Sequence, residues 1–166
     1  KNELSIYIDE ISNSLKNVFD EHYKNVSMLS EEEDIIVALR NNKTHDFSKK
    51  FCSLNNIITH HQPEISTIIL IDAYGNMIHR HPLSTDSIFD YSYREDINSV
   101  LREEKFHLSS LFTDDNKKLS IAISQPVFYN GDFQGIVRTT IFLETLVDLF
   151  FKPIERESNM VLIFDS

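Results

Sequence analysis

The sequence predicts an α+β fold in which a long N-terminal helix packs on an antiparallel sheet. Through the first third of the chain, apolar residues recur every three or four positions, which is the spacing of one helix face. Two strand-like pairs, in residues 65–82 and 118–143, are each interrupted by a turn signal. Strands joined by so short a turn pair antiparallel. One helix-like segment separates the two pairs.

The N-terminal region, residues 1–62, is expected to be helical. Its first helix should run from Asn2 to about Ser27. The apolar stripe of this helix is broad, so most of it should pack on the sheet, and the remainder would suit a parallel homodimer through a coiled-coil-like seam. The stripe comprises Leu4, Ile8, Ile11, Leu15, Val18 and His22, widened by Ile6, Tyr7, Phe19 and Tyr23.

Two shorter helices are predicted after the first. Ser30 and Glu33 fit the S-x-x-E capping box, and the acidic residues around them suit the positive end of a helix dipole. A third helix is expected from Thr44 to about His60, and Pro63 should end it because proline cannot continue a helix.

The sheet module, residues 63–166, should begin with a hairpin from Ile65 to Pro82. Its turn falls at residues 72–76, where Asp, Gly and Asn favour tight turns. The second hairpin, from Lys118 to Leu143, should turn at Asn130-Gly131, which is a strong short hairpin signal.

A helix between the two hairpins is predicted to start at Ser92, which forms a capping box with Glu95, and to end near Lys105. On the strand that follows, side chains alternate between two faces. The face of small residues leaves room either for a ligand or for a closely packed helix. Leu119, Ile121 and Ile123 lie on one face, and Ser120, Ala122 and Ser124 lie on the other.

Composition excludes several classes of function. A net charge of −10 argues against nucleic-acid and anionic-membrane partners, which usually meet a basic face. The single cysteine, Cys52, allows no intramolecular disulfide. No apolar run reaches the roughly 18 residues of a membrane span, and no signal peptide leads the chain. Because the chain begins at Lys1 and stops straight after an apolar strand, we expect a piece of a longer protein.

Catalytic motifs are missing from the sequence. It contains no G-x-S-x-G, no H-E-x-x-H and no glycine-rich phosphate loop, and only three glycines in all. The sequence therefore predicts a domain that is not an enzyme and needs no cofactor.

Four segments together resemble the Cache family of extracytoplasmic sensor domains, which are PAS-like modules of bacterial and archaeal histidine kinases, chemoreceptors and diguanylate cyclases. In chain order they are IDAYGNMIHRHP, DYSYREDINSVLREEKFHLSSLF, LSIAISQPVFYNGDFQGIVRTTIFLETLVDLF and MVLIFDS. The resemblance covers roughly residues 65–166. It implies a PAS-like central sheet of about five strands with flanking helices, a long helix entering from a transmembrane segment, and a small-molecule pocket between the sheet and the Ser92 helix. The last strand, Met160 to Phe164, would complete the module where the chain ends.

Arg94 is the leading candidate for ligand binding. Its guanidinium could hold a carboxylate or phosphate through two parallel hydrogen bonds, and the neighbouring Tyr91 and Tyr93 would lower the local dielectric constant. In the family that the chain resembles, an arginine at this point often reaches the ligand. The alternative is a surface arginine that pairs with Glu95 or Asp90. Further candidates are Ser124, Asp72, Tyr74, His79, Asp96 and Thr140.

The chain departs from the family subset that senses amino acids. That subset pairs its arginine with a tryptophan two positions later, and it holds the ligand's ammonium with an aspartate late in the GIVRTTI-type strand. Here those positions are Asp96 and Thr140. An α-amino acid would lose its cation partner unless Asp96 replaced the late aspartate, so a carboxylate without an amine, or another small polar solute, fits better.

Histidines are numerous, with seven in the chain. His79 and His81 are two apart on a predicted strand, so their rings should share one face. Without a placed carboxylate or cysteine they are a weak zinc signal, and no metal site is predicted.

These observations predict an extracytoplasmic ligand-sensing domain of a membrane-bound receptor, most simply a sensor histidine kinase. Two alternatives stay open: a module that binds a periplasmic protein partner, and a dimer spacer that binds nothing. Either alternative would be favoured by a fully packed core beneath Arg94.

Overall fold

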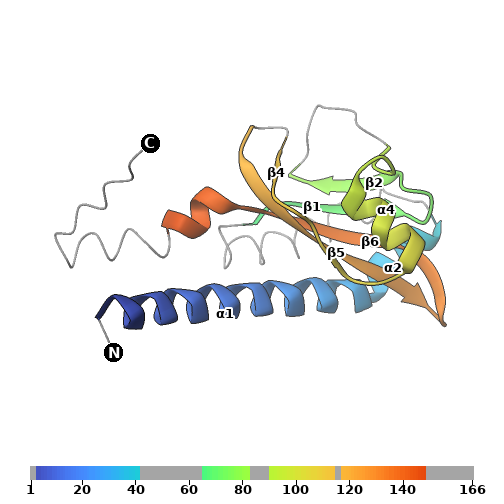
Figure 1. The fold of residues 1–166 in the computed structure, drawn as a ribbon. Helices are drawn as coiled ribbons and strands as arrows, with labels where there is room; N and C mark the ends of the chain where they lie inside the picture. The colour runs from blue at the N-terminus through green and yellow to red at the C-terminus, as the bar shows by residue number, and fades with distance from the viewer. Residues whose placement is uncertain (1–2, 42–64, 83–89, 115–116, 149–166) are drawn as a thin grey trace.

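The computed structural model describes residues 3–41, 65–82, 90–114 and 117–148 (Figure 1). Residues 143–148, after the last strand, form a short helix. The other elements, in chain order, are α1 (Glu3–Glu31), α2 (Glu33–Asn41), β1 (Ile65–Asp72), β2 (Met77–His81), α4 (Glu95–Glu103), β3 (His107–Leu108), β4 (Phe112–Thr113), β5 (Leu119–Tyr129) and β6 (Asp132–Phe142).

The strands in the described ranges all join one antiparallel sheet with the order β2-β1-β6-β5-β3, and β4 also pairs with β5. The long strands β5 and β6 lie next to each other at its centre, with 11 residues each. The two-residue strands β3 and β4 follow one another along the outer edge of β5. The predicted α+β fold is confirmed, with six strands among the described residues where about five were expected.

Both hairpin turns form where the sequence places them. In the first, the Asp72 carboxylate accepts the backbone N–H groups of Tyr74 and Asn76 at 2.9 and 2.8 Å, and Gly75 has a φ of +93°. In the second, Asn130 and Gly131 have φ values of +51° and +88°. Two consecutive positive φ values twist a two-residue turn as the flanking strands require.

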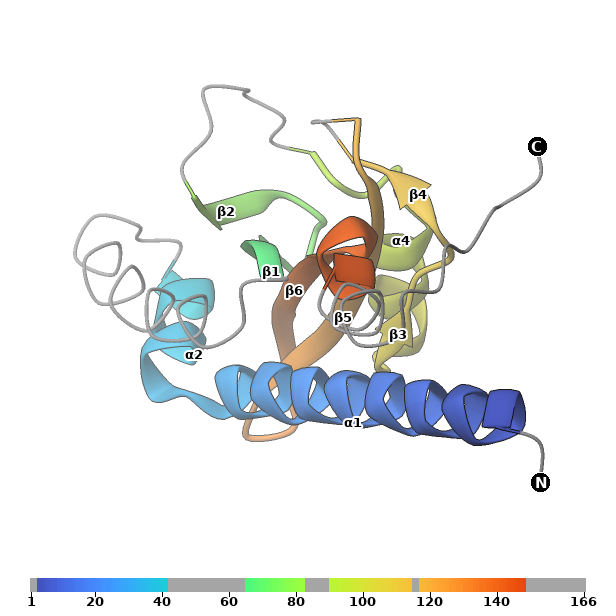
Figure 2. The same cartoon turned by 90° about the vertical axis from the view of Figure 1, so that its left-hand side faces the viewer.

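Helices cover both faces of the sheet, with α1 and α2 on one side and α4 on the other (Figures 1 and 2). The strand register shows which residues face which helices, because residues directly opposite one another on neighbouring strands project to the same face of the sheet. Ile69, Arg138 and Ser124 are paired across β1, β6 and β5 and lie on the α4 side. The predicted face of small residues on β5 is also buried on that side.

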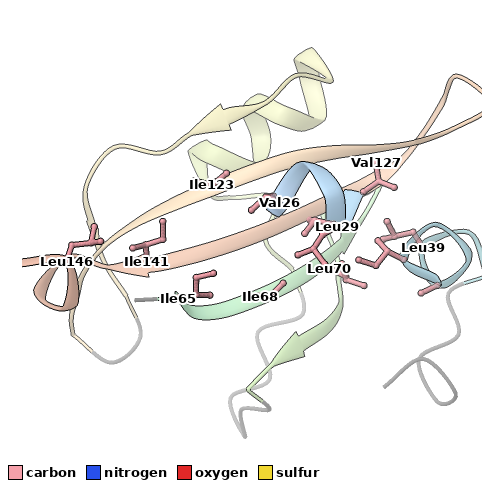
Figure 3. Packing of buried hydrophobic residues seen from close by; sticks show 13 residues of the cluster. Val26, Leu29, Leu39, Ile65, Ile68, Leu70, Ile123, Val127, Ile141 and Leu146 are labelled. Carbon is pink, nitrogen blue, oxygen red and sulfur yellow. The ribbon is translucent and has the colours of Figure 1, made fainter. Parts of the chain in front are cut away.

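The larger core lies between the sheet and the first two helices (Figure 3). Side chains from one face of α1 and α2 meet the sheet residues that alternate with those facing α4. The members are Val26, Leu29, Ile35, Ala38, Leu39, Ile65, Ile68, Leu70, Ile123, Val127, Val137, Ile141 and Leu146. A smaller core under α4 holds Ile69, Ile71, Tyr91, Ile97, Val100 and Ile136.

Helix α1 packs on the sheet with its C-terminal half. His22 and Val26 are fully buried there, whereas Ile6 and Ile8 near its start are 44% and 57% exposed. The expectation that most of the apolar stripe packs within the chain therefore holds for this half. No helix among the described residues is long and apolar enough to cross a membrane.

The capping box at Ser30 was a wrong prediction. Helix α1 continues past Ser27 to Glu31, so Ser30 lies inside it, and its hydroxyl donates to the Ser27 carbonyl at 2.7 Å. Helix α2 begins at Glu33, where the Glu32 carbonyl accepts the N–H groups of Ile35 and Ile36.

The start of α4 was also predicted wrongly. The helix begins at Glu95, and Arg94 occupies its N-cap position without a side-chain cap. Ser92 cannot cap the helix because its hydroxyl donates to the Asp90 carboxylate at 2.6 Å. A turn closed by the Arg94 N–H and the Tyr91 carbonyl comes before the helix, which ends at Glu103.

Three expectations lie outside the described residues. They are the helix from Thr44 to His60, the strand from Met160 to Phe164, and the boundary between the regions 1–62 and 63–166.

Candidate functional site

A buried ion pair joins α4 to the sheet. Asp96 is the second residue of α4, and Arg138 lies in the middle of β6. The Arg138 Nε donates to the Asp96 Oδ2 at 2.7 Å, and the two side chains are 2% and 6% exposed. Arg138 also donates from Nη1 to the Thr140 hydroxyl at 2.8 Å. The strand thus places a full positive charge beneath the start of the helix.

Arg94 approaches the same carboxylate from the other side. Its Nε lies 3.4 Å from the Asp96 Oδ1, and 19% of its side chain is exposed. The guanidinium carbons of Arg94 and Arg138 lie 4.6 and 5.3 Å from the ring centroid of Phe112 on β4. One carboxylate and one aromatic ring therefore hold two guanidinium groups close together.

Two cavities flank this arrangement. The inner cavity, of about 20 Å³, lies on the sheet and is lined by Thr67, Ile69, Arg80, Tyr91, Arg94, Phe112, Asp114, Arg138 and Thr140. The outer cavity, of about 400 Å³, lies between the start of α4 and the segment that carries β3 and β4. Its lining is Tyr93, Arg94, Glu95, Asp96, His107, Leu108, Ser109, Ser110 and Phe112.

The inner cavity is electropositive. Three arginines, at positions 80, 94 and 138, lie around it with two aspartates, at positions 96 and 114, so the group has a formal charge of +1. The Nη2 atom of Arg138 is buried and has no hydrogen-bond partner among the described residues. A buried cationic donor without a partner is costly, and a bound anion would satisfy it.

The titration of the pair follows from burial and from charge. Burial would raise the pKa of Asp96, but the charge and hydrogen bond of Arg138, and then those of Arg94, outweigh burial and hold this pKa below its ordinary value. Burial lowers the pKa of Arg138, and the Asp96 carboxylate opposes this. For both groups, burial and the charge of the partner therefore act in opposite directions.

Comparison with known proteins gives no match to a family model and no match to a curated protein. Solved structures do match. An extracellular ligand-binding receptor from Desulfohalobium retbaense superposes with a TM-score of 0.72 at 16% identity, over 90% of this chain and 27% of that one. The sensor domain of the V. cholerae histidine kinase DctB gives a TM-score of 0.72 at 15% identity, over 90% of this chain and 58% of that one.

A third match is the ligand-binding domain of the Pseudomonas aeruginosa amino acid chemoreceptor PctB, solved with L-Arg. Its TM-score is 0.64 at 15% identity, over 90% of this chain and 62% of that one. The chain has the fold of bacterial extracellular sensor domains. This confirms, for the fold, the resemblance found in the sequence. The chain spans 27–62% of the length of these three matched chains.

Within this sensor-domain fold, five of the nine predicted site residues come together. Tyr91, Arg94 and Thr140 line the inner cavity, and Tyr93, Arg94 and Asp96 line the outer one. A sixth, Ser124, is fully buried directly opposite Arg138, and its hydroxyl has no hydrogen-bond partner among the described residues.

The other three predicted residues line neither cavity. Asp72 shapes the β1–β2 turn, and Tyr74 at its tip is 83% exposed. That turn supports the site indirectly, because the Gly75 carbonyl accepts the Tyr91 N–H at 2.8 Å. His79 is paired with Leu70 and so faces α1 and α2, on the opposite side of the sheet.

His79 and His81 do share one strand face, because they pair with Leu70 and Ile68. Burial lowers the pKa of both, and for His79 the charge of His81 adds to this effect. Within the described residues, no three His, Cys, Asp or Glu side chains are grouped as metal ligands.

Sequence reasoning missed Arg138, Arg80 and Phe112. Alternation along β6 could have revealed Arg138, because it lies two residues before Thr140 and therefore on the same face. Arg80 lies on the α4 side of β2, directly opposite Ile69. No local pattern indicates Phe112, because it belongs to a two-residue strand positioned only by its pairing with β5.

Proposed function

We propose that this chain is the extracytoplasmic ligand-sensing domain of a membrane-bound signalling receptor, most simply a sensor histidine kinase. Its ligand is a small carboxylate or similar anion, bound between the sheet and α4. One observation carries the choice of ligand: within the described part of the chain, the Nη2 of buried Arg138 has no hydrogen-bond partner, and Arg138 shares the Asp96 carboxylate with a second guanidinium, that of Arg94. Arginine is well suited to such a site because its planar fork matches a carboxylate.

The same geometry argues against an α-amino acid. The Asp96 carboxylate already accepts a hydrogen bond from Arg138 and lies against Arg94, so an ammonium group would have to compete with two guanidiniums for it. Position 140 carries a threonine whose hydroxyl accepts a hydrogen bond from Arg138. The solved PctB domain is a complex with L-Arg, so the fold itself does not exclude an amino acid, and it is the residues of this chain that disfavour one.

Ligand binding would act on the receptor through the elements that meet at the site. Asp96 and Arg94 belong to the start of α4, Arg138 belongs to the sheet, and α1 packs on the other face of that sheet. A ligand that contacts one arrangement of these elements better than another shifts the balance between them. A homodimer through α1 remains a prediction, to which exposed Ile6 and Ile8 could contribute.

One observation favours the alternative functions. The inner cavity is nearly filled by the protein's own side chains, at about 20 Å³, as expected for a module that binds a protein partner or for a spacer. The adjoining outer cavity of about 400 Å³ favours the sensor, because it is within the usual size of small-molecule pockets, roughly 300–1,000 Å³.

A thermal-shift titration tests the proposal. Small carboxylates, phosphate, amino acids, amines and sugars would be added to the purified domain and to two variants, Arg94→Ala and Arg102→Ala. Arg102 is the matched control because it lies on the same helix and its side chain is 70% exposed. A carboxylate should raise the melting temperature with dose in the wild type and in Arg102→Ala, but not in Arg94→Ala. No shift with any anion, or an equal shift in Arg94→Ala, would overturn the anion site.

A further inference from the structure

Phe112 stands at the boundary between the two cavities. It and Arg94 are the residues that line both, whereas Arg138 lines the inner cavity alone. The ring is seated against both guanidiniums, 4.6 Å from the carbon of Arg94 and 5.3 Å from that of Arg138. Arg94 and the Phe112 ring therefore lie between the outer cavity and Arg138.

The two cavities that meet at the Phe112 ring differ greatly in volume. The inner cavity, at about 20 Å³, has room for about one water molecule, since a water needs roughly 10–15 Å³ of such space. The outer cavity is twenty times larger. The buried Nη2 of Arg138 thus lies beside a cavity that is too small, as it stands, to hold an organic anion.

We propose that Phe112 determines the specificity of this site by occupying the ligand's place against Arg94 and Arg138, and that a bound carboxylate displaces its ring and joins the two cavities. This inference rests on the proposed anion-binding function and adds the residue that controls access. A carboxylate competes well with the ring, because charge-assisted hydrogen bonds to arginine are stronger than a cation–π contact and would also satisfy the free Nη2.

The strand that carries the Phe112 ring is paired with the sheet through few residues. Strand β4 has two residues and pairs with β5 through Phe112 opposite Ser120 and Thr113 opposite Leu119. Asp114, two residues after Phe112, is held separately: its N–H donates to the Lys118 carbonyl, its carbonyl accepts the Lys117 N–H, and its carboxylate accepts the Lys118 N–H. Short edge elements open locally at low cost, so β4 can shift the ring without disturbing β5.

The test compares the wild type with Phe112→Ala, Phe112→Leu and Leu111→Ala. Leucine keeps an apolar side chain without the ring, which guards against loss of folding in the alanine variant. Leu111 is the control because it adjoins Phe112 in sequence, lines neither cavity and is 54% exposed. Binding of acetate, succinate and benzoate would be measured by isothermal titration calorimetry.

The carboxylate that binds most tightly to the wild type should bind at least about tenfold more tightly to Phe112→Ala or Phe112→Leu, because no ring has to be displaced. Its affinity for Leu111→Ala should equal that for the wild type. Equal or weaker binding by both Phe112 variants would overturn the role of Phe112 and leave the anion site standing. Absence of binding to every protein, including the variants with the opened cavity, would overturn the proposed function itself.

A measurement without ligand adds a second criterion. Phenylglyoxal modifies accessible arginines, and mass spectrometry of peptides locates the modified residue. Arg138, at 2% exposure, should be modified slowly in the wild type and several times faster in Phe112→Leu, whereas exposed Arg102 should react alike in both. Equal rates at Arg138 would show that the ring does not close the inner cavity.

Discussion

The Arg138 Nε lies 2.7 Å from the Asp96 Oδ2, and this buried contact joins the middle of β6 to the first turn of α4. Removing two charges from water is costly, and such a pair repays the cost only with good geometry and further hydrogen bonds. Arg138 has one such bond, to Thr140, and its Nη2 has no hydrogen-bond partner among the residues that the structure describes. The pair therefore fixes the position of α4 on the sheet, and it leaves the Nη2 of Arg138 able to donate hydrogen bonds to a ligand.

Breaking the pair from one side should be strongly destabilising. Asp96→Asn leaves the Arg138 charge buried without a full counter-charge, which should lower the free energy of unfolding by about 3–5 kcal/mol. The control, Glu103→Gln, breaks the exposed ion pair with Arg102 on the same helix and should change the free energy of unfolding by less than about 1 kcal/mol. Urea unfolding at pH 7 measures both. Similar losses in the two variants would contradict the structural role given to the buried pair.

The same pair should make the domain sensitive to acid. The pKa of Asp96 is lower in the folded state than in the unfolded state. The Asp96 carboxylate therefore contributes fully to the free energy of unfolding when the pH is above its pKa in the unfolded state, and this contribution is lost as the pH falls through its pKa in the folded state. The relevant range lies below about pH 4, near the ordinary pKa of aspartate. The difference in unfolding free energy between wild type and Asp96→Asn should shrink over that range. Urea unfolding at pH 7, 4, 3 and 2.5 would measure this difference. A difference that stays constant with pH would contradict the stabilising role of the Asp96 charge.

The architecture could be predicted from sequence because its signals are local. Alternation along β5 and the turn residues Asn130 and Gly131 act through their own backbone and neighbours, and the structure has both as expected. The helix starts were mispredicted for a related reason. Ser30 and Ser92 match a local capping pattern, but each hydroxyl has a different acceptor in the folded chain, the Ser27 carbonyl and the Asp90 carboxylate.

The site could be predicted only in part, because it depends on contacts between distant segments. Arg94 and Asp96 were identified from the helix in which they lie, yet Arg138, 42 residues beyond Asp96, supplies the strongest contact to it. Nothing local indicates that pairing. The absence of a late aspartate at Thr140 was correctly noted, whereas the arginine two residues earlier on the same strand face was not considered.

Gly135 and Gly131 provide a matched pair of glycines on the same hairpin. Both have positive φ, +149° and +88°, so alanine is strained at either position. At Gly131 an added Cβ meets nothing within 4 Å, and Gly131→Ala should cost only the backbone strain, about 1–2 kcal/mol. At Gly135 the Cβ would overlap the Ile71 carbonyl oxygen of β1 and press on Leu39 of α2.

Gly135→Ala should therefore cost clearly more, about 3 kcal/mol or above, because overpacking adds to the strain. The clash lies where β6 passes β1 under α2, so the loss reports on close packing of helix and sheet. Midpoints of urea unfolding for the two variants give the comparison directly. If Gly131→Ala were as damaging as Gly135→Ala, backbone strain alone would account for both, and the close approach of Gly135 to Ile71 would contribute nothing measurable.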